Sequence, residues 1–324
     1  MNKYVLNDWY KNNTFNCLDF NDLKELNESK NKKTISLVIP TLNEEETIGF
    51  IISKIFNELN HDYNIIDEVI IIDGGSTDKT INIVTLLETK YNRLKLIHEK
   101  DILNEYKNKK GKGNQLWKGL YYSTGDIVLY CDSDIKNFDI HMITGMIGPL
   151  LINNIKFIKG FYERPLIIDG KVKNNQGGRV TELCARPLLN LFYPELGCYL
   201  QPLGGEYGGY REVLENINYM TGYGVEIRLL IEIYEKYGLD VMGQVDLLKR
   251  EHKHQDITSL TKMSFVIMSV VLNYNHLNLN QNLLIKNSNS DSKDYLLNVD
   301  NACDEILPRI KEIRNYYKIN SKNV

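Results

Sequence analysis

The chain has 324 residues, of which 43% are hydrophobic and 25% charged, and its formal net charge is -3. This length suits one large α/β domain, or such a domain with appended elements, and the composition is that of a globular protein. The slightly acidic balance excludes a global basic field, so no nucleic acid partner is expected and any anionic substrate must be bound locally.

The cysteines and the apolar stretches indicate in which cellular compartment the protein is expected. The five cysteines are scattered without metal-type spacing, which favours a reducing compartment over a disulfide framework. The first twenty residues lack the continuous apolar core of a signal peptide. The longest late apolar stretch, 265–272, is too short to span a bilayer. We therefore expect a cytoplasmic protein with no membrane partner.

The N-terminal part predicts a helix followed by the first strand. Residues 1–33 are polar with a few apolar anchors and predict one short helix packed on the main body. Residues 34–39 alternate as a strand. We interpret Asn43 as the N-cap, and Glu46 as its capping-box partner, of a helix that ends at Leu59. Open α/β sheets bind ligands at the carboxyl end of such a strand.

Two further strands follow. Residues 68–72 predict a strand that ends in the turn Gly74-Gly75, where glycine permits a close approach to a ligand. Ser76 or Thr77 is expected to cap the next helix, and residues 94–98 predict a third strand. The alternation of strands and helices predicts a doubly wound, largely parallel sheet.

A basic, glycine-rich segment at 109–115 opens the next predicted helix. Its backbone N–H groups, the helix dipole and the ammonium group of Lys112 together suit an anion. The spacing differs from that of a Walker A loop. A flexible basic turn is the alternative, but the aspartate motif that follows favours a pyrophosphate site.

The aspartate motif follows a predicted buried strand at 127–131. Asp132 and Asp134 lie at i and i+2, so both carboxylates leave the strand end in the same direction. Oxygen ligands in this arrangement can hold Mg²⁺ or Mn²⁺, with substrate phosphates completing the coordination. The alternative is that one aspartate caps the next segment and the other is solvated.

The middle of the chain supplies a second candidate anion site. Gly178, Arg179 and Thr181 offer a permissive backbone, a guanidinium and a hydroxyl for a phosphate or carboxylate. The alternative is a helix start with Arg179 paired to Glu182 or Glu195. The elements predicted around this site are a helix at 142–151, a strand at 157–164, a hairpin or loop at 165–175 and a helix that ends at 191.

A glycine-dense segment and a helix start come next. Residues 201–210 are interpreted as a loop that approaches a ligand closely, because a purely structural connection rarely needs so many glycines. A helix begins near 223, with Glu226 in its first turn. In a pocket Glu226 would be a base or an acceptor for sugar hydroxyls; the alternative is an exposed carboxylate stabilised by the helix dipole.

The C-terminal part predicts a second set of metal ligands and helices. His252 and His254 face one side of an extended segment and could ligate the metal, although such a pair is usually a surface feature. The remaining predicted elements are a last strand at 241–248, an amphipathic helix at 260–274 that docks on the domain or on a second subunit, a mobile linker at 276–294 and a terminal helix at 305–317.

Over residues 34–270 the chain resembles the retaining GT-A glycosyltransferases that make glucosyl-3-phosphoglycerate. The stretches that carry this resemblance are Ile39 to Glu45, Ile72 to Asp78, Gly111-Lys112-Gly113, Asp132-Ser133-Asp134, Lys159 to Leu166, Gly177 to Leu183, Ala185 to Asn190, Gln201 to Leu203, Gly205 to Tyr207, Gly222 to Ile227 and His252 to Asp256.

The resemblance implies a GT-A fold, with a Rossmann-like, mostly parallel sheet flanked by helices, an acceptor-binding part and a helical C-terminal extension. It implies transfer of glucose from UDP-glucose to the 2-hydroxyl of 3-phospho-D-glycerate with retention, Mg²⁺ or Mn²⁺ as cofactor, and a homodimer. The division expected is an N-terminal helical segment at 1–33, a nucleotide-sugar half at 34–135, an acceptor half at 136–258 and C-terminal helices at 259–324.

The resemblance also implies roles for individual residues. Two positions depart from the family, which often carries Ala in place of Thr41 and Ser in place of Gly74. The implied roles are donor binding by Pro40, Thr41, Leu42, Glu44, Gly74, Gly75, Lys112 and Asp132, acceptor binding by Gly178, Arg179, Thr181 and His254, metal ligation by Asp134 and His252, and contact with the transferred sugar by Glu226 and the carbonyl of Leu203.

Other functions of the same fold stay open. GDP-mannose could be the donor, unphosphorylated glycerate the acceptor, or a lipid phosphate the acceptor. A non-catalytic nucleotide-sugar sensor is a further alternative, which the joint presence of Lys112, Asp132, Asp134, Glu226 and His252 disfavours.

Overall fold

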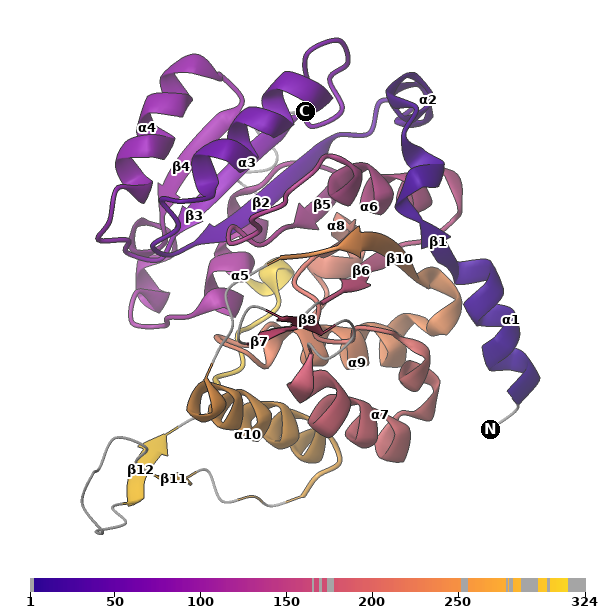
Figure 1. The fold of residues 1–324 in the computed structure, drawn as a ribbon, viewed down its shortest axis with the longest axis vertical. Helices are drawn as coiled ribbons and strands as arrows, with labels where there is room; N and C mark the ends of the chain where they lie inside the picture. Colours follow the sequence, from indigo (N-terminus) through magenta and orange to yellow (C-terminus); the bar gives the residue numbers. More distant parts are fainter. Residues whose placement is uncertain are drawn as a thin grey trace.

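An eight-stranded sheet forms the centre of the computed structural model (Figure 1), which describes residues 3–164, 166–168, 171–173, 178–251, 256–277, 279, 282–286, 297–301 and 304–313. The strand order is β1-β10-β6-β9-β5-β2-β3-β4, and only β9 runs antiparallel to its neighbours. The prediction of a largely parallel sheet is confirmed. The strands are β1 Thr14–Asn16, β2 Ile35–Thr41, β3 Glu68–Asp73, β4 Leu94–His98, β5 Ile127–Tyr130, β6 Phe157–Glu163, β9 Tyr207–Tyr210 and β10 Met242–Lys249.

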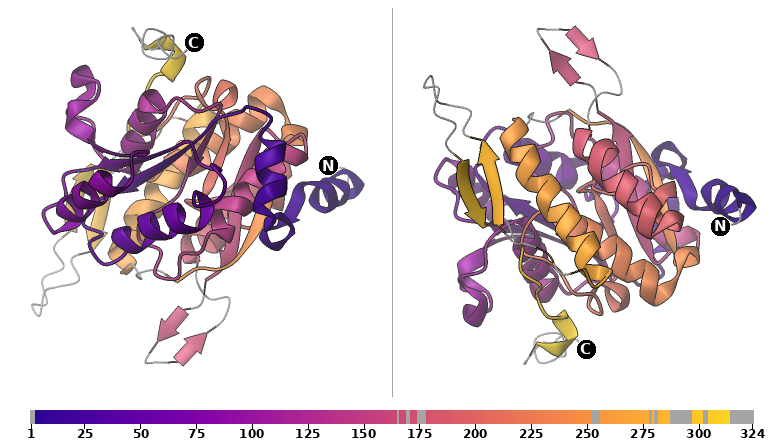
Figure 2. Two further views of the ribbon diagram at one scale, coloured as in Figure 1. Left: turned by 90° about the horizontal axis from the view of Figure 1, so that it is seen from above. Right: turned by 90° about the horizontal axis from the view of Figure 1, so that it is seen from below.

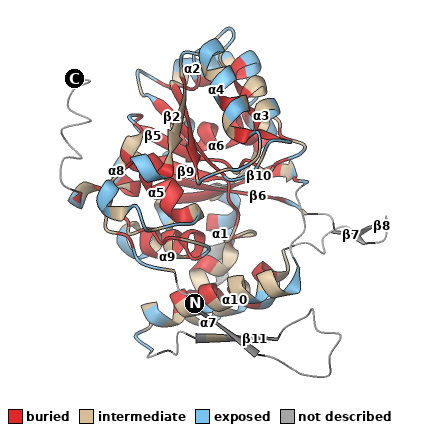
Figure 3. Cartoon of the chain, turned by 90° about the vertical axis from the view of Figure 1, so that its left-hand side faces the viewer, coloured by how far each residue is buried: buried red, intermediate tan, exposed pale blue. Residues whose placement is uncertain are grey.

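Helices cover both faces of this sheet, as the two end-on views in Figure 2 show. Successive residues of a strand point to opposite faces. In β2, Val38 therefore packs in the core on one face of the sheet, beneath α5 (Lys112–Tyr122) and α9 (Val225–Tyr237). Leu37 and Ile39 pack in the core on the other face, beneath α3 (Ile48–Lys54) and α6 (His141–Ile152). Strands buried on both faces read as continuous apolar runs, which explains the Val- and Ile-rich β2 and β3. Figure 3 shows buried residues concentrated along the sheet and the inner faces of these helices.

The helices largely follow the sequence prediction. Five-residue π-helical turns extend α3 to Leu59 and precede α7 at Thr181–Ala185. The α-helices are α1 Lys3–Asn13, α2 Leu23–Ser29, α3 Ile48–Lys54, α4 Thr80–Lys90, α5 Lys112–Tyr122, α6 His141–Ile152, α7 Arg186–Phe192, α8 Arg211–Leu214, α9 Val225–Tyr237 and α10 Ile257–Tyr274. The predicted hairpin at 165–175 corresponds to β7 Leu166–Ile168 and β8 Lys171–Lys173, and it projects from the body (Figure 2).

The topology gathers several strand ends at one edge. Because β2, β3, β5, β6 and β10 are parallel, their carboxyl ends lie at the same edge of the sheet. Strand β9 is antiparallel, so the segment that precedes it, 203–206, arrives at that edge as well. Residues from both halves of the chain therefore meet there.

The predicted helix caps were wrong. Asn43 has a positive φ of 57° and does not cap α3, which begins after Thr47. Its side-chain oxygen instead accepts a hydrogen bond from Thr77 N at 2.8 Å, which joins the loop after β2 to the loop after β3. Helix α4 begins after Lys79, so neither Ser76 nor Thr77 caps it. These polar side chains link two loops because both loops lie at the same edge of the sheet.

The glycine-dense segment at 201–210 was wrongly predicted as a loop throughout. Its second half is β9, a buried strand between β5 and β6. A side chain on Gly208 would lie 2.6 Å from Val128 O, so this glycine serves close strand packing rather than ligand binding. Only the part before β9 remains available to a ligand.

Both ends of the chain contain strands that the sequence analysis missed. Besides helices, residues 1–33 contain strand β1, which pairs with β10 at the edge of the sheet. Strand β10 is not the last, because β11 Asn282–Lys286 and β12 Leu297–Asn301 form a hairpin that includes part of the predicted linker. The described part of the predicted terminal helix, 305–313, contains a β-bridge at Ile306 and the 3-10 turn Ile310–Glu312 rather than an α-helix, and it buries Leu307, Ile310 and Ile313. Residues 314–317 of that prediction lie outside the described residues.

Helix α10 is longer than the apolar stretch seen in the sequence. By length and composition alone, this 18-residue helix is long and apolar enough to cross a membrane. The sequence analysis had expected no such stretch late in the chain. In the structure Val266, Ile267 and Val270 of this helix are buried against the domain. The helix therefore contributes to the core as well as exposing apolar residues such as Met268.

Candidate active site

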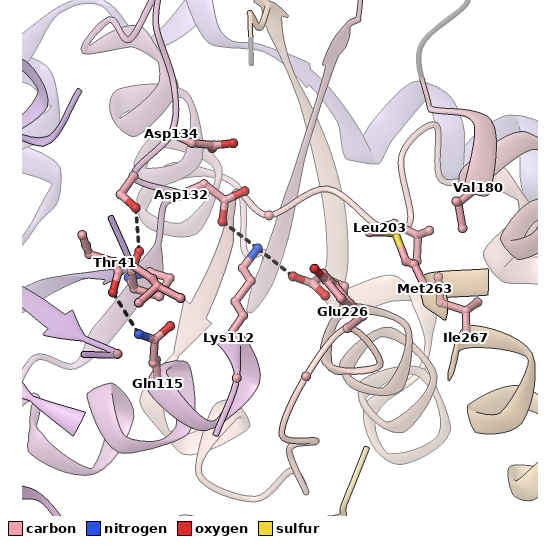
Figure 4. Close-up of a pocket in the computed structure, with 18 of the residues that line it drawn as sticks. Thr41, Lys112, Gln115, Asp132, Asp134, Val180, Leu203, Glu226, Met263 and Ile267 are labelled. Carbon is pink, nitrogen blue, oxygen red and sulfur yellow. Dashed lines mark hydrogen bonds and ion pairs between the residues drawn. The ribbon is translucent and has the colours of Figure 1, made fainter. Parts of the chain in front are cut away.

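A cavity of about 580 Å³ opens at the edge where the strand ends meet. Figure 4 shows Lys112 at its centre, with Thr41 and Gln115 on one side and Glu226, Leu203, Val180, Met263 and Ile267 on the other. Of the residues predicted from the sequence, the cavity brings together Pro40, Thr41, Leu42, Glu44, Gly74, Lys112, Asp132, Asp134, Gly178, Arg179, Thr181, Leu203 and Glu226.

Lys112 joins two carboxylates across the cavity. Its ammonium nitrogen lies 2.6 Å from Asp132 Oδ1 and 2.9 Å from Glu226 Oε1. Burial disfavours the charged form, but the attraction of Asp132 and Glu226 outweighs it and raises the pKa of Lys112 well above its ordinary value. Lys112 is therefore a fixed positive charge at the start of α5, and not part of a flexible basic turn.

The start of α5 is held in place by its glycines. Gly111 precedes the helix with a φ of 110°, and a side chain there would lie 2.6 Å from Thr221 O. This close packing fixes the direction in which Lys112 leaves the helix. In the first turn, Asn114 N donates to Thr221 O at 3.0 Å and strengthens this contact.

Arg250 holds the acidic side chains of the site together. Its Nη2 lies 2.9 Å from Asp132 Oδ2 and 2.6 Å from Asp134 Oδ1. Its Nη1 donates to both carboxylate oxygens of the buried Glu206, at 2.6 and 2.8 Å, and to Tyr162 Oη at 2.8 Å. Burial opposes ionisation of Asp132, but Lys112 and Arg250 hold its pKa well below the usual range. The sequence analysis missed Arg250, although it directly follows a strand that ends at this edge.

The two carboxylates of the aspartate motif both line the cavity, at the end of β5. Ser133, between the two aspartates, donates from Oγ to Pro40 O at 2.8 Å and so joins the turn after β5 to the end of β2. Neither aspartate is merely solvated, because both are paired with Arg250. Their oxygens are hard ligands that suit Mg²⁺ or Mn²⁺. Within the described ranges no cluster of three His, Cys, Asp or Glu side chains forms a complete metal site, and the predicted ligand His252 lies outside those ranges, as does His254.

The far end of the cavity combines the segment predicted to bind an anion with an apolar wall. Gly178, with a φ of 72°, Arg179 and Thr181 line it together with Arg164. Glu182, one of the two partners considered for Arg179 in the sequence analysis, pairs with Arg186 at 2.8 Å. Helix α10 supplies the apolar residues Leu260, Met263 and Ile267, which the sequence analysis did not foresee because the helix is remote in the chain.

Glu226 is 6% exposed, which excludes the alternative of an exposed carboxylate. It lies in the first turn of α9, whose start is held by residue Asp304: Gly224 N donates to Asp304 Oδ2 at 2.6 Å. Leu203 faces the same region, in a turn held by Lys159, whose Nζ donates to Gly204 O at 2.7 Å. Burial lowers the pKa of Lys159 to about 7.

The other end of the cavity is formed by the ends of β2 and β3. Gly74 lines it, but Gly75 belongs to the turn, where its N–H donates to Asp73 Oδ2 at 2.9 Å and its φ is 102°. Gln115 of α5, which the sequence analysis did not single out, lies beneath Thr41 and Gly74. A polar residue three positions after Lys112, on the same helix face, was the signal that could have identified it.

The chain is similar to known glycosyltransferases. Residues 36–156 match Glycosyl transferase family 2. The glucosyl-3-phosphoglycerate synthase of Petrotoga mobilis is 45% identical over 280 residues, which cover 84% of this chain and 85% of that protein.

Solved structures of glucosyl-3-phosphoglycerate synthases are also similar to this chain. The glucosyl-3-phosphoglycerate synthase of Mycobacterium tuberculosis in complex with Mn²⁺, UDP and phosphoglyceric acid is 35% identical, with a TM-score of 0.79 over 90% of this chain and 95% of that one. The same enzyme with Mn²⁺, UDP-glucose and phosphoglyceric acid is 35% identical, with a TM-score of 0.78 and the same shares covered.

Proposed function

The chain belongs to the glucosyl-3-phosphoglycerate synthase family, and on that basis we propose that it transfers glucose from UDP-glucose to the 2-hydroxyl of 3-phospho-D-glycerate, releasing UDP. The GT-A fold and the match to glycosyl transferase family 2 agree with this activity. The roles that the resemblance implies for individual residues are part of this proposal.

One observation carries the proposal: a single cavity contains both a cation–carboxylate cluster around Lys112 and, further along, a second segment that suits an anion. Lys112 faces the middle of the cavity, where the diphosphate of a nucleotide sugar would lie. Gly178, Arg179 and Thr181 are beyond Glu226 and suit the phosphate or carboxylate of a small acceptor. A donor and a phosphorylated acceptor can therefore meet between them.

The divalent cation would be held by Asp134, with His252 as the predicted second protein ligand. The oxygen donors of Asp132 and Asp134 fit such an ion. When bound, the cation neutralises charge that develops on the leaving diphosphate. Lys112 contributes a further positive charge on the same side, and Arg250 keeps both aspartates oriented.

Retention of anomeric configuration is explained here by attack on the same face of the sugar. The anomeric carbon–oxygen bond to the diphosphate breaks, the acceptor 2-oxygen bonds to that carbon, and its proton passes to the leaving phosphate oxygen. Glu226 orients sugar hydroxyls, because its Oε1 is already paired with Lys112 at 2.9 Å and is a weakened nucleophile. A glucosyl adduct trapped on Glu226 would defeat this mechanism and favour double displacement.

The deciding experiment measures UDP release by the purified protein from UDP-glucose with a divalent cation. Release that 3-phosphoglycerate stimulates, and that unphosphorylated glycerate does not, is the expected result. GDP-mannose in place of UDP-glucose tests the donor. No release with any pair would favour a nucleotide-sugar sensor.

We further propose that the protein acts in the cytoplasm as a homodimer, without a membrane partner. The free cysteines Cys17, Cys131, Cys184 and Cys198 support a reducing compartment. The partly exposed apolar residues of α10 support a second copy as the partner of this helix. Light scattering and fractionation of the native protein test these two points.

A further inference from the structure

Gln115 is a buried side chain with a fixed orientation in the cavity wall. It is 6% exposed, and its Nε2 donates to Thr41 O at 3.1 Å and to Ile72 O at 3.2 Å. Both partners are backbone carbonyls, which only accept hydrogen bonds. The amide nitrogen must therefore face the ends of β2 and β3, and the two bonds prevent the amide from turning over.

The same bonds determine where the amide oxygen points. Oε1 leaves the amide carbon on the side away from Thr41, and Figure 4 shows it directed into the cavity. Among the described residues none donates a hydrogen bond to this oxygen, and Gln115 lines the cavity. The wall thus presents one oriented hydrogen-bond acceptor to a ligand.

Gly74 makes room for this arrangement. A side chain at position 74 would overlap the amide nitrogen of Gln115 and come within 3.3 Å of its Cδ. The two positions therefore cannot both carry a side chain in these conformations. With glycine at 74, the polar group of this part of the wall comes from Gln115.

The position of Gln115 along the cavity indicates which part of a donor it meets. Lys112 separates it from Glu226 and Leu203 (Figure 4), which face the transferred sugar in the proposed reaction. A nucleotide sugar whose diphosphate lies at Lys112 extends its nucleoside toward Thr41, Gly74 and Gln115. The carboxylate of Glu44 lines the same end and suits the ribose hydroxyls.

We propose that Gln115 selects the nucleobase of the donor, with Oε1 accepting a hydrogen bond from the ring imide N–H of uracil. This inference rests on the proposed function and adds a specificity-determining residue to it. Cytosine carries no hydrogen on the corresponding ring nitrogen, so the fixed acceptor faces a second acceptor when a cytidine nucleotide binds. An unpaired buried acceptor costs about 1–3 kcal/mol, which corresponds to roughly a 5- to 150-fold difference in affinity.

Calorimetric titration of UDP and CDP, each with Mn²⁺, into the unaltered protein and Gln115→Leu tests the inference. The unaltered protein should prefer UDP by about fivefold or more, and Gln115→Leu should lose most of that preference by weakening UDP binding. Affinity for 3-phosphoglycerate, which binds at the other end of the cavity, should stay unchanged and reports that the variant is folded.

A second pair of variants covers the possibility that Gln115→Leu unfolds. In Gln115→Ala the acceptor is lost and space appears beside Gly74; Gln115→Ala with Gly74→Ser places a hydroxyl in that space and should restore part of the preference for UDP. An equal loss of affinity for UDP and for CDP overturns the inference, because a ribose contact or a purely structural role would cause it. Failure of the unaltered protein to bind UDP overturns the proposed donor and this inference with it, whereas UDP binding with an unchanged preference in Gln115→Leu overturns the inference alone.

Discussion

The Nη2 atom of Arg250 lies 2.6 Å from Oδ1 of Asp134, joining the residue after β10 to the residue expected to hold the metal. The two residues are 116 positions apart in the chain. The same guanidinium also neutralises Glu206, which is fully buried. Arg250 therefore contributes both to the expected metal site and to the stability of the fold.

Arg250→Met should destabilise the fold by about 3–5 kcal/mol, because it leaves the charge of Glu206 buried without its partner. Urea unfolding monitored by circular dichroism measures the loss. Arg250→Met combined with Glu206→Gln should recover much of it, since the buried charge is then absent. A double variant as unstable as Arg250→Met would show that the lost packing of the arginine matters more than the charge.

Removal of the divalent cation should abolish glucose transfer, and Mn²⁺ should restore it. Asp134→Asn should weaken Mn²⁺ binding at least about tenfold, because a neutral amide oxygen replaces a charged ligand. Calorimetry measures the affinity directly. Asp139→Asn is the control, since Asp139 pairs with Lys54 and His141 outside the cavity. Unchanged Mn²⁺ affinity in Asp134→Asn would exclude Asp134 as a ligand.

Arg179→Ala should raise the KM for 3-phosphoglycerate by about 10- to 100-fold and that for UDP-glucose far less, because a charge-assisted hydrogen bond to the acceptor is lost. Steady-state kinetics with each substrate varied in turn separates the two effects. Arg186→Ala is a matched control on the neighbouring helix, where the guanidinium pairs with Glu182. Equal changes in both KM values would count against an acceptor role.

Lys159 should make the protein more stable as the pH rises from 7 to about 8.5. Burial lowers its pKa to about 7 from the ordinary value of 10.5, so in this range the unfolded chain binds more protons than the folded chain. The free energy of unfolding must then increase with pH. Lys159→Met should lose this slope, while Lys136→Met, at an exposed position, should keep it. A slope unchanged in Lys159→Met would assign the pH dependence to other groups.

Asp304→Ala should lower kcat for glucose transfer, because Asp304 accepts from Gly224 N and thereby positions the first turn of α9 with Glu226. We expect a loss of roughly tenfold with little change in either KM, since a small displacement of a positioned group weakens transition-state contacts. Asp304→Asn, which keeps an acceptor oxygen, should retain most of the activity. An equally inactive Asp304→Asn would point to the charge rather than the hydrogen bond.

The sequence alone determined the local elements and the residue types of the site. Apolar runs identified β2, β3 and β5 within a residue or two, because a strand buried on both faces has few polar positions. The glycines around Lys112 and the spacing of Asp132 and Asp134 identified polar groups at element ends. These features depend on residues close together in the chain, so a pattern in the sequence reveals them.

Tertiary structure alone decided how distant segments combine. Arg250 meets Asp134, α10 closes the acceptor end and Asp304 supports α9 because strand order brings these segments together, and strand order depends on packing between residues far apart in the chain. The same reason explains why 207–210 was mistaken for loop: its glycines are needed only because β5 and β6 lie on either side. Gln115 belongs to this group as well, since its orientation depends on two carbonyls contributed by different strands.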